Sequence, residues 1–320
     1  MFSCQFAAQN HFYSITGLAL LLASAVFSQP AATGAGTGVF VKGTKITMVP
    51  PEAFVPAGNF AGFQQEASGA SIMVVSIPAP YETIAASMNS QGFASQGIVV
   101  DNTEKLQISG LPGILMSGSQ KAHGLTYIRY SLIFGNEKES IIINGACPDK
   151  SAGVPAKIKA SILTTVYHPD VLIDPVAEAD FELDTKPSQL RFAGNVANSL
   201  IFTMDGNLPP EVADKTMLVA AKSFSELAVS QQKEFATRRL QGLPMTIEKV
   251  ISTDSVMTDS LAGYEILAEG TSRETGIREF VLLHILYGES YYYLMVGTTE
   301  KETILPRLKT VIRSFRRKKP

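Results

Sequence analysis

The chain has 320 residues, of which 45% are apolar and 18% are charged, and its formal net charge is −2. This composition excludes a disordered tail, a collagen-like repeat and a disulfide-dense scaffold. A near-neutral chain also lacks the basic charge that is typical of nucleic-acid binders, so no nucleic-acid partner is predicted. The length is sufficient for two domains, each with its own core.

The first segment predicts export from the cell. Residues 15–27 form an apolar run of 13 residues, which is shorter than a membrane span of about 20 residues and matches the core of a signal peptide. Small side chains follow, so residues 1–28 are predicted to be a signal peptide and residues 29–42 a flexible linker. Residues 1–14 contain no Lys or Arg, which leaves a buried core helix as the alternative. The predicted location is periplasmic or secreted.

Export leaves one cysteine in the mature chain. Cys4 lies in the predicted signal peptide, so Cys147 has no partner for an internal disulfide. Cys147 ends a strand-like run before Pro148, where a small buried residue is expected. A lone thiol is also a candidate nucleophile, but that role needs a neighbouring base and a lowered pKa. An enzyme that uses Cys147 is therefore kept as an alternative.

The chain contains two copies of one pattern. A strand-like run that begins at Gly124 has a counterpart that begins at Gly276, and the strands that follow end at Gly145 and Gly297. Both pairs of glycines are 152 residues apart. Each copy then ends in a segment whose apolar residues recur at helical spacing. The repeat predicts two related structural units.

Each copy predicts strands, a helix, several antiparallel strands and a final helix. Short glycine-bounded connections are typical of hairpins, and the helices must cover sheet faces. The predicted class is therefore α+β, with domains at residues 43–168 and 181–316, a linker at residues 169–180 and a basic tail at residues 317–320. Residues 280–286 are apolar on both faces of their strand, which predicts that both faces of the second sheet are covered.

Three segments of the first copy have a familiar pattern: Gly43–Phe54, Ala70–Val75 and Gly110–Gly113. With the glycine-bounded strands, they resemble the bacterial envelope proteins related to DcrB, within the wider PsbP-like fold, and residues 181–316 resemble a second, diverged copy. The resemblance implies two tandem α/β/α sandwich domains, each a central antiparallel sheet flanked by helices. It also implies a non-catalytic protein that binds or stabilises another macromolecule. The second copy has Leu261–Glu265 in place of the Gly110–Gly113 turn, so a binding surface that uses this turn is not expected there.

One histidine of the second copy is a candidate site residue. At the offset of 152 residues, His284 replaces Leu132 on an apolar strand face, and a buried imidazole needs a hydrogen-bond partner. His284 is therefore either a satisfied core histidine or a pH-sensitive or ligand-facing residue of the second domain. A catalytic role for His284 is a further alternative. No two of the four histidines have zinc-ligand spacing, so no metal and no other cofactor is predicted.

The C-terminal end is strongly basic. Residues 307–319 contain seven cations and no acid, which leaves −9 for the rest of a chain whose net charge is −2. Cations near the end of a helix interact favourably with its dipole, so their position does not require a ligand. The functional alternative is attraction to an anionic membrane or polymer surface. The candidate binding residues of this end are Arg313, Arg316, Arg317, Lys318 and Lys319.

Together these patterns predict an exported, non-catalytic envelope protein that binds or stabilises a macromolecular partner, with a protein of the cell envelope as the expected partner. Two alternatives stay open. One is a binder of anionic surfaces that uses the basic tail, and the other is an enzyme that uses Cys147 or His284. No catalytic residue is assigned from the sequence.

Overall fold

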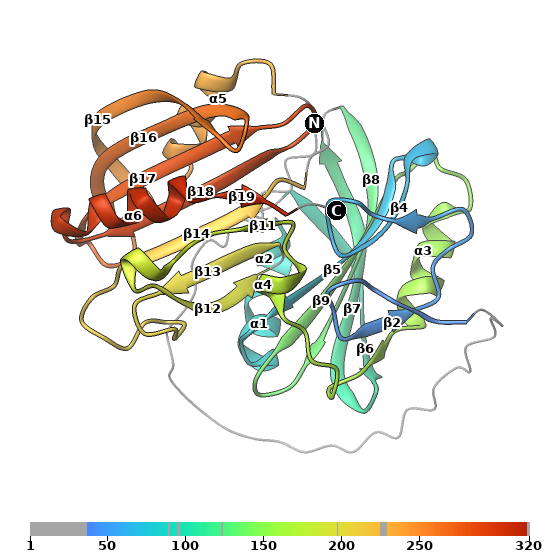
Figure 1. Cartoon of the computed structure of the whole chain (residues 1–320). Helices are drawn as coiled ribbons and strands as arrows, with labels where there is room; N and C mark the ends of the chain where they lie inside the picture. Colours follow the sequence, from blue (N-terminus) through green and yellow to red (C-terminus); the bar gives the residue numbers. More distant parts are fainter. Residues whose placement is uncertain are drawn as a thin grey trace.

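The computed structural model describes residues 37–88, 90–94, 97–122, 124–196, 198–224 and 229–318. These residues form two units, each built around a seven-stranded antiparallel sheet (Figure 1). The predicted signal peptide, most of the predicted linker at 29–42 and His123 lie outside the described residues. Among the helices of the described chain, none has the length and apolar character that a membrane span requires.

The first sheet has the strand order β3-β4-β5-β9-β8-β7-β6. The turn between β6 and β7 consists of Ser109 and Gly110, and both have positive φ, as a type I′ hairpin turn requires. The strands are β3 (Val55–Pro56), β4 (Gly62–Gln65), β5 (Ala70–Ile77), β6 (Ile98–Ile108), β7 (Leu111–Ala122), β8 (Leu125–Gly135) and β9 (Ser140–Pro148).

The second sheet repeats this order as β12-β13-β14-β18-β17-β16-β15. The β6–β7 and β15–β16 hairpins are offset by 150 residues, and two additional residues in the β16–β17 turn raise the offset to 152 for β17 and β18. The offset returns to 150 at the final strands, β10 and β19. The repeat is therefore present in the order and in the register of the strands. The strands are β12 (Arg191–Val196), β13 (Ser199–Thr203), β14 (Met217–Lys222), β15 (Met245–Thr258), β16 (Leu261–Ser272), β17 (Arg278–Tyr287) and β18 (Tyr292–Thr299).

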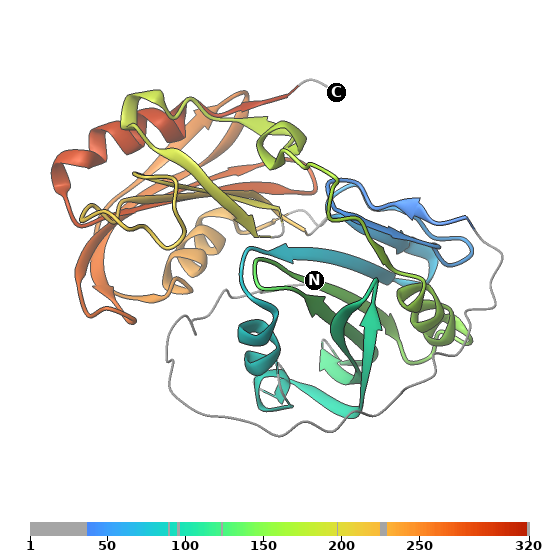
Figure 2. The same ribbon diagram turned by 90° about the horizontal axis from the view of Figure 1, so that it is seen from below.

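Helices lie on both faces of each sheet (Figures 1 and 2). In the first unit α3 (Val154–Leu163) packs on β8 and β9, and α1 (Tyr81–Ser87) and α2 (Ser90–Ala94) lie on the opposite face. In the second unit α6 (Leu305–Arg313) packs on β17 and β18, and α5 (Gln232–Gln241) lies on the opposite face. The helices remove apolar side chains on both sheet faces from water, which stabilises the units. The predicted α+β class, based on antiparallel sheets, is confirmed.

In each unit, one short sheet joins the beginning of the unit to its end. In the first unit, β2 (Ile46–Met48) pairs with β1 (Val39–Phe40) and with β10 (Val166–Tyr167). In the second unit, β11 (Phe181–Glu182) pairs with β19 (Arg316–Arg317). The chain that follows each final helix is thus bound to a strand near the start of the same unit.

Several short elements lie within or across the predicted boundaries. β1 lies inside the predicted linker at 29–42, and a short helix, α4 (Pro175–Glu178), lies inside the predicted linker at 169–180. The predicted boundary between residues 316 and 317 falls within β19. The first two residues of the predicted basic tail, Arg317 and Lys318, are therefore held to the second unit by main-chain bonds.

Candidate functional site

A polar cluster lies inside the second unit. His284 on β17 and Glu265 on β16 are directly opposite in the strand register, and their side chains are 0% and 2% exposed. The imidazole Nδ1 lies 3.2 Å from Glu265 Oε2, and Nε2 lies 3.3 Å from the Thr258 hydroxyl of β15. β16 and β15 therefore supply the hydrogen-bond partners that a buried imidazole needs.

Two cations of α6 reach the same carboxylate from the helix side. Arg313 donates from Nε to Glu265 Oε2 at 3.1 Å and from Nη2 to Oε1 at 3.0 Å, and Lys309 Nζ lies 2.8 Å from Oε1. Both point the same way because residues four apart share a helix face. Burial by itself raises the pKa of Glu265, but hydrogen bonds from His284, Lys309 and Arg313 outweigh it and lower the pKa to about 2. Glu265 is therefore ionised at neutral pH and ties α6 to the sheet.

The two strand positions that hold Glu265 and His284 are apolar in the first unit. Leu115 and Leu132 are paired on β7 and β8 as Glu265 and His284 are on β16 and β17, and both leucines are buried. At an offset of 150 residues, three further positions are apolar in the first unit and polar or charged in the second. They are Ile108, Leu163 and Val166 in the first unit, and Thr258, Arg313 and Arg316 in the second. The second unit thus has a charged corner where the first unit buries two leucines, whereas Leu163 and Val166 are exposed and Lys159 takes the place of Lys309.

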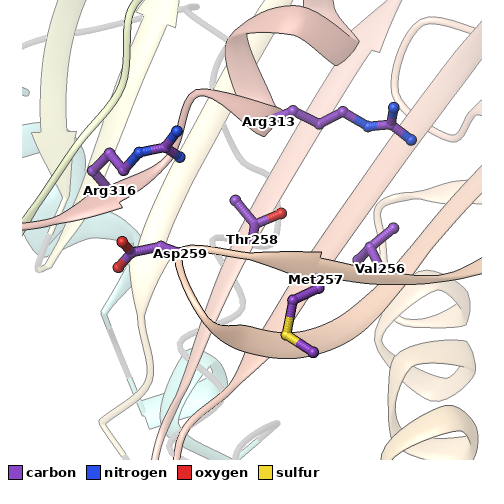
Figure 3. Close-up of a pocket in the computed structure, with 6 residues that line it drawn as sticks. All are labelled: Val256, Met257, Thr258, Asp259, Arg313 and Arg316. Atoms are coloured by element: carbon purple, nitrogen blue, oxygen red, sulfur yellow. The ribbon is translucent and has the colours of Figure 1, made fainter.

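A pocket of about 510 Å³ opens beside this cluster (Figure 3). Its walls come from the end of β15, the β15–β16 turn, the end of α6 and β19. The Thr258 hydroxyl connects the pocket to the buried His284. The residues that line the pocket are Val256, Met257, Thr258, Asp259, Arg313 and Arg316.

The described part of the basic end is folded onto the second unit. Arg317 donates to Asp259 Oδ2 from its side-chain Nε at 2.7 Å and from its main-chain N at 3.1 Å, and these hydrogen bonds lower the pKa of Asp259. Lys318 Nζ donates to two carbonyl oxygens of α4 at 2.7 and 2.9 Å. Arg317 and Lys318 are thus engaged within the chain, Arg313 and Arg316 line the pocket, and Lys319 lies outside the described residues.

Cys147 lies on β9 in the core of the first unit and has no exposed surface. Burial raises the pKa of its thiol to about 11. A nucleophilic cysteine needs a lowered pKa and access to its substrate, so this geometry does not support the enzyme alternative at Cys147. Within the described ranges, no group of three or more His, Cys, Asp or Glu side chains could hold a metal ion.

The sequence analysis singled out His284 and the two arginines of the pocket but missed Glu265, which connects His284 to Arg313. A single offset of 152 residues aligns Glu265 with Gly113 of the first copy, whereas in the structure Glu265 occupies the position that corresponds to Leu115. The difference arises because the two additional residues come after β16 in the chain. Aligning the hairpins at an offset of 150 would have shown an acid at a buried leucine position.

No protein-family model matches this chain, and no curated protein matches it. Among solved structures, the chain is similar to the immunity protein TplEi of the T6SS from Pseudomonas aeruginosa, at 12% identity and a TM-score of 0.30, over 83% of this chain and 96% of that chain. A structure of the Tle4–Tli4 complex matches at 12% identity and a TM-score of 0.30, over 83% and 98%. A structure from Bacteroides thetaiotaomicron matches at 14% identity and a TM-score of 0.29, over 46% of this chain and 52% of that chain. Scores of this size assign neither a fold nor a function, and the resemblance to DcrB-related proteins stays a prediction.

Proposed function

We propose that this chain is an exported, non-catalytic protein that binds a protein partner in the bacterial cell envelope. In this proposal, residues 43–168 and 181–316 are tandem α/β/α sandwich domains of the kind that the DcrB-related resemblance implies. The apolar run at residues 15–27 supports export. Helices on both faces of each sheet support the sandwich arrangement.

The observation that carries the proposal is the charged corner of the second unit. The first unit buries Leu115 and Leu132 at the same place, so this topology does not need charges there. A buried ion cluster is often no more stabilising than well-packed apolar side chains of similar volume. The charges therefore serve recognition better than stability, and a pocket of about 510 Å³ lined by two arginines is a suitable contact point.

Catalysis by His284 fits the geometry less well than binding does. A catalytic imidazole must reach the reacting atoms, but His284 has no exposed surface. Its two ring nitrogens face Glu265 and Thr258. The imidazole is therefore better placed to hold Glu265, and through it Arg313, in position.

An anionic membrane surface is a weaker explanation of the basic end. Membrane attraction needs several cations that face the lipid together. Arg317 is paired with Asp259, and Lys318 is bound by carbonyl oxygens of α4. Arg313 shares the charge of Glu265. A discrete acidic group of a protein fits the pocket that Arg313 and Arg316 line better than a lipid surface does.

Crosslinking of the full chain in intact cells tests the proposal. Wild type is compared with Arg316→Val, which copies Val166 of the first unit, and with Arg307→Val, which removes an exposed cation of α6 outside the pocket. Wild type and Arg307→Val should capture the same protein, and Arg316→Val should capture it about 10-fold less. Recovery of only the free chain, or equal capture by all three, would contradict the proposal.

A further inference from the structure

The strand that borders the pocket is a free edge of its sheet. β15 is the last strand in the sheet order, and among the described strands only β16 pairs with it (Figure 1). The register of β15 with β16 is irregular between Ile247 and Ser252 and is continuous from Ser252 to Thr258. This regular stretch leads into the pocket, because Val256 and Thr258 belong to the pocket wall.

We propose that the partner docks by strand addition: an extended segment pairs with the outer edge of β15 at Ser252–Thr258 and places an acidic side chain between Arg313 and Arg316. This inference rests on the proposed function, which supplies a protein partner. Extended segments bind sheet edges through main-chain hydrogen bonds, and pockets beside the edge select their side chains. The pocket of the second unit supplies this selection.

The direction of the side chains agrees with this arrangement. Val256 packs against the core on the α6 side of the sheet, and Thr258, two residues further, projects to the same side. A residue directly opposite either of them on an added strand would have its Cβ about 4.5–5.5 Å away on the same face. Its side chain would therefore enter the pocket.

The charge of the pocket selects an acid. Arg313 uses Nε and Nη2 for Glu265, which leaves its Nη1 for a ligand. Arg316 is exposed and donates from Nη1 to the carbonyl oxygen of the preceding residue, so its Nη2 can face a ligand. The one acid of the pocket wall, Asp259, is already paired with Arg317. A carboxylate is the group that guanidinium donors bind most specifically in a protein partner.

The first unit has the same edge without the same site. Among the described strands, β6 is likewise an edge strand of its sheet and pairs regularly with β7 from Asn102 to Ile108, but Lys105 stands where the second unit has Ser255. Lysine on an edge strand opposes strand addition. Both hairpins close with a two-residue turn of positive φ, so the main-chain N–H groups of Lys105 and Ser255 both point outward. The two positions therefore form a matched pair for a test.

A photo-crosslinking amino acid in place of Ser255, in the full chain and in intact cells, provides that test. The same amino acid in place of Lys105 is the control. The trapped segment is mapped by mass spectrometry and synthesised, and the Kd of this peptide is measured with wild type, Ser255→Pro, Ser255→Lys and Lys105→Pro. Proline removes the outward N–H, and lysine copies the edge of the first unit. Circular dichroism checks that each variant is folded.

We expect crosslinking at position 255 but not at 105, to a segment that contains Asp or Glu. Ser255→Pro, Ser255→Lys and Arg316→Val should each raise the Kd about 10-fold or more, and so should replacing the acid of the peptide by its amide. Lys105→Pro should leave the Kd unchanged. Crosslinks to lipid or to a second copy of this chain would overturn the inference, and so would equal binding of the amide peptide. If the whole chain captures a partner but position 255 does not, strand addition is overturned and the proposed function stands.

Discussion

Replacing Glu265 by glutamine should destabilise the second unit at neutral pH. The carboxylate is 2% exposed, and its pKa is about 2 in place of 4.5. This difference corresponds to about 3 kcal/mol of unfolding free energy. Because folding lowers the pKa, the contribution is complete above about pH 4.5 and is lost as the pH falls through about 2. Glu265→Gln should therefore cost about 3 kcal/mol at pH 7 and about 1 kcal/mol at pH 3.

Urea unfolding at several pH values, followed by hydrogen exchange at the amides of β16 and β17, measures the second unit separately from the first. Glu104→Gln is the control, because Glu104 forms a partly exposed pair with Lys159 in the first unit and such pairs contribute about 0–1 kcal/mol. The reasoning is refuted if Glu265→Gln unfolds like wild type at pH 7. It is also refuted if the cost of the substitution does not change with pH.

Thiol reactivity, core packing and lipid binding give three further tests. Because Cys147 has no exposed surface and burial raises the pKa of its thiol to about 11, the thiol should react with iodoacetamide at least about 100-fold more slowly in the folded chain than in urea; equal rates would contradict its burial. Gly145→Ala should destabilise the first unit by about 1–3 kcal/mol, because its Cβ would lie 2.4 Å from Ile158 Cγ2. Gly297→Ala should cost the second unit less, because its nearest contact would be 3.4 Å; thermal unfolding with the reverse order would contradict this packing. The full chain should not sediment with anionic vesicles at about 150 mM salt, and salt-sensitive sedimentation would favour the membrane alternative.

The parts of the fold that depend on local patterns could be predicted from the sequence. Glycine-bounded strands such as the run from Gly124 and the helical spacing that ends each copy led to the α+β class and the repeat. The cross-strand partner of His284 could not be predicted, because it depends on where two additional residues enter a turn. The short helix α4 was also missed, although Asp174 accepts hydrogen bonds from two main-chain N–H groups at its start, as an N-cap does before a proline.

Arg313 illustrates which part of the site could not be predicted from the sequence. Its position near the end of a basic helix was visible in the sequence, and the dipole of that helix was a sufficient explanation. Its carboxylate partner lies 48 residues earlier in the chain, on another element. Charge patterns along a chain show cations that gather, but they do not show which of them a buried acid has already engaged.

The matched registers of the two sheets also affect how the chain assembles. Tandem copies with the same strand order are prone to exchange strands while they fold. If β7 took the place of β16, Leu115 would lie opposite His284, and the imidazole would lose its carboxylate. In the reverse exchange, Glu265 would be buried opposite Leu132, at a cost of several kcal/mol for an unpaired charge. The charged corner therefore discriminates between correct and mixed sheets, so the divergence of the copies favours faithful folding of each one.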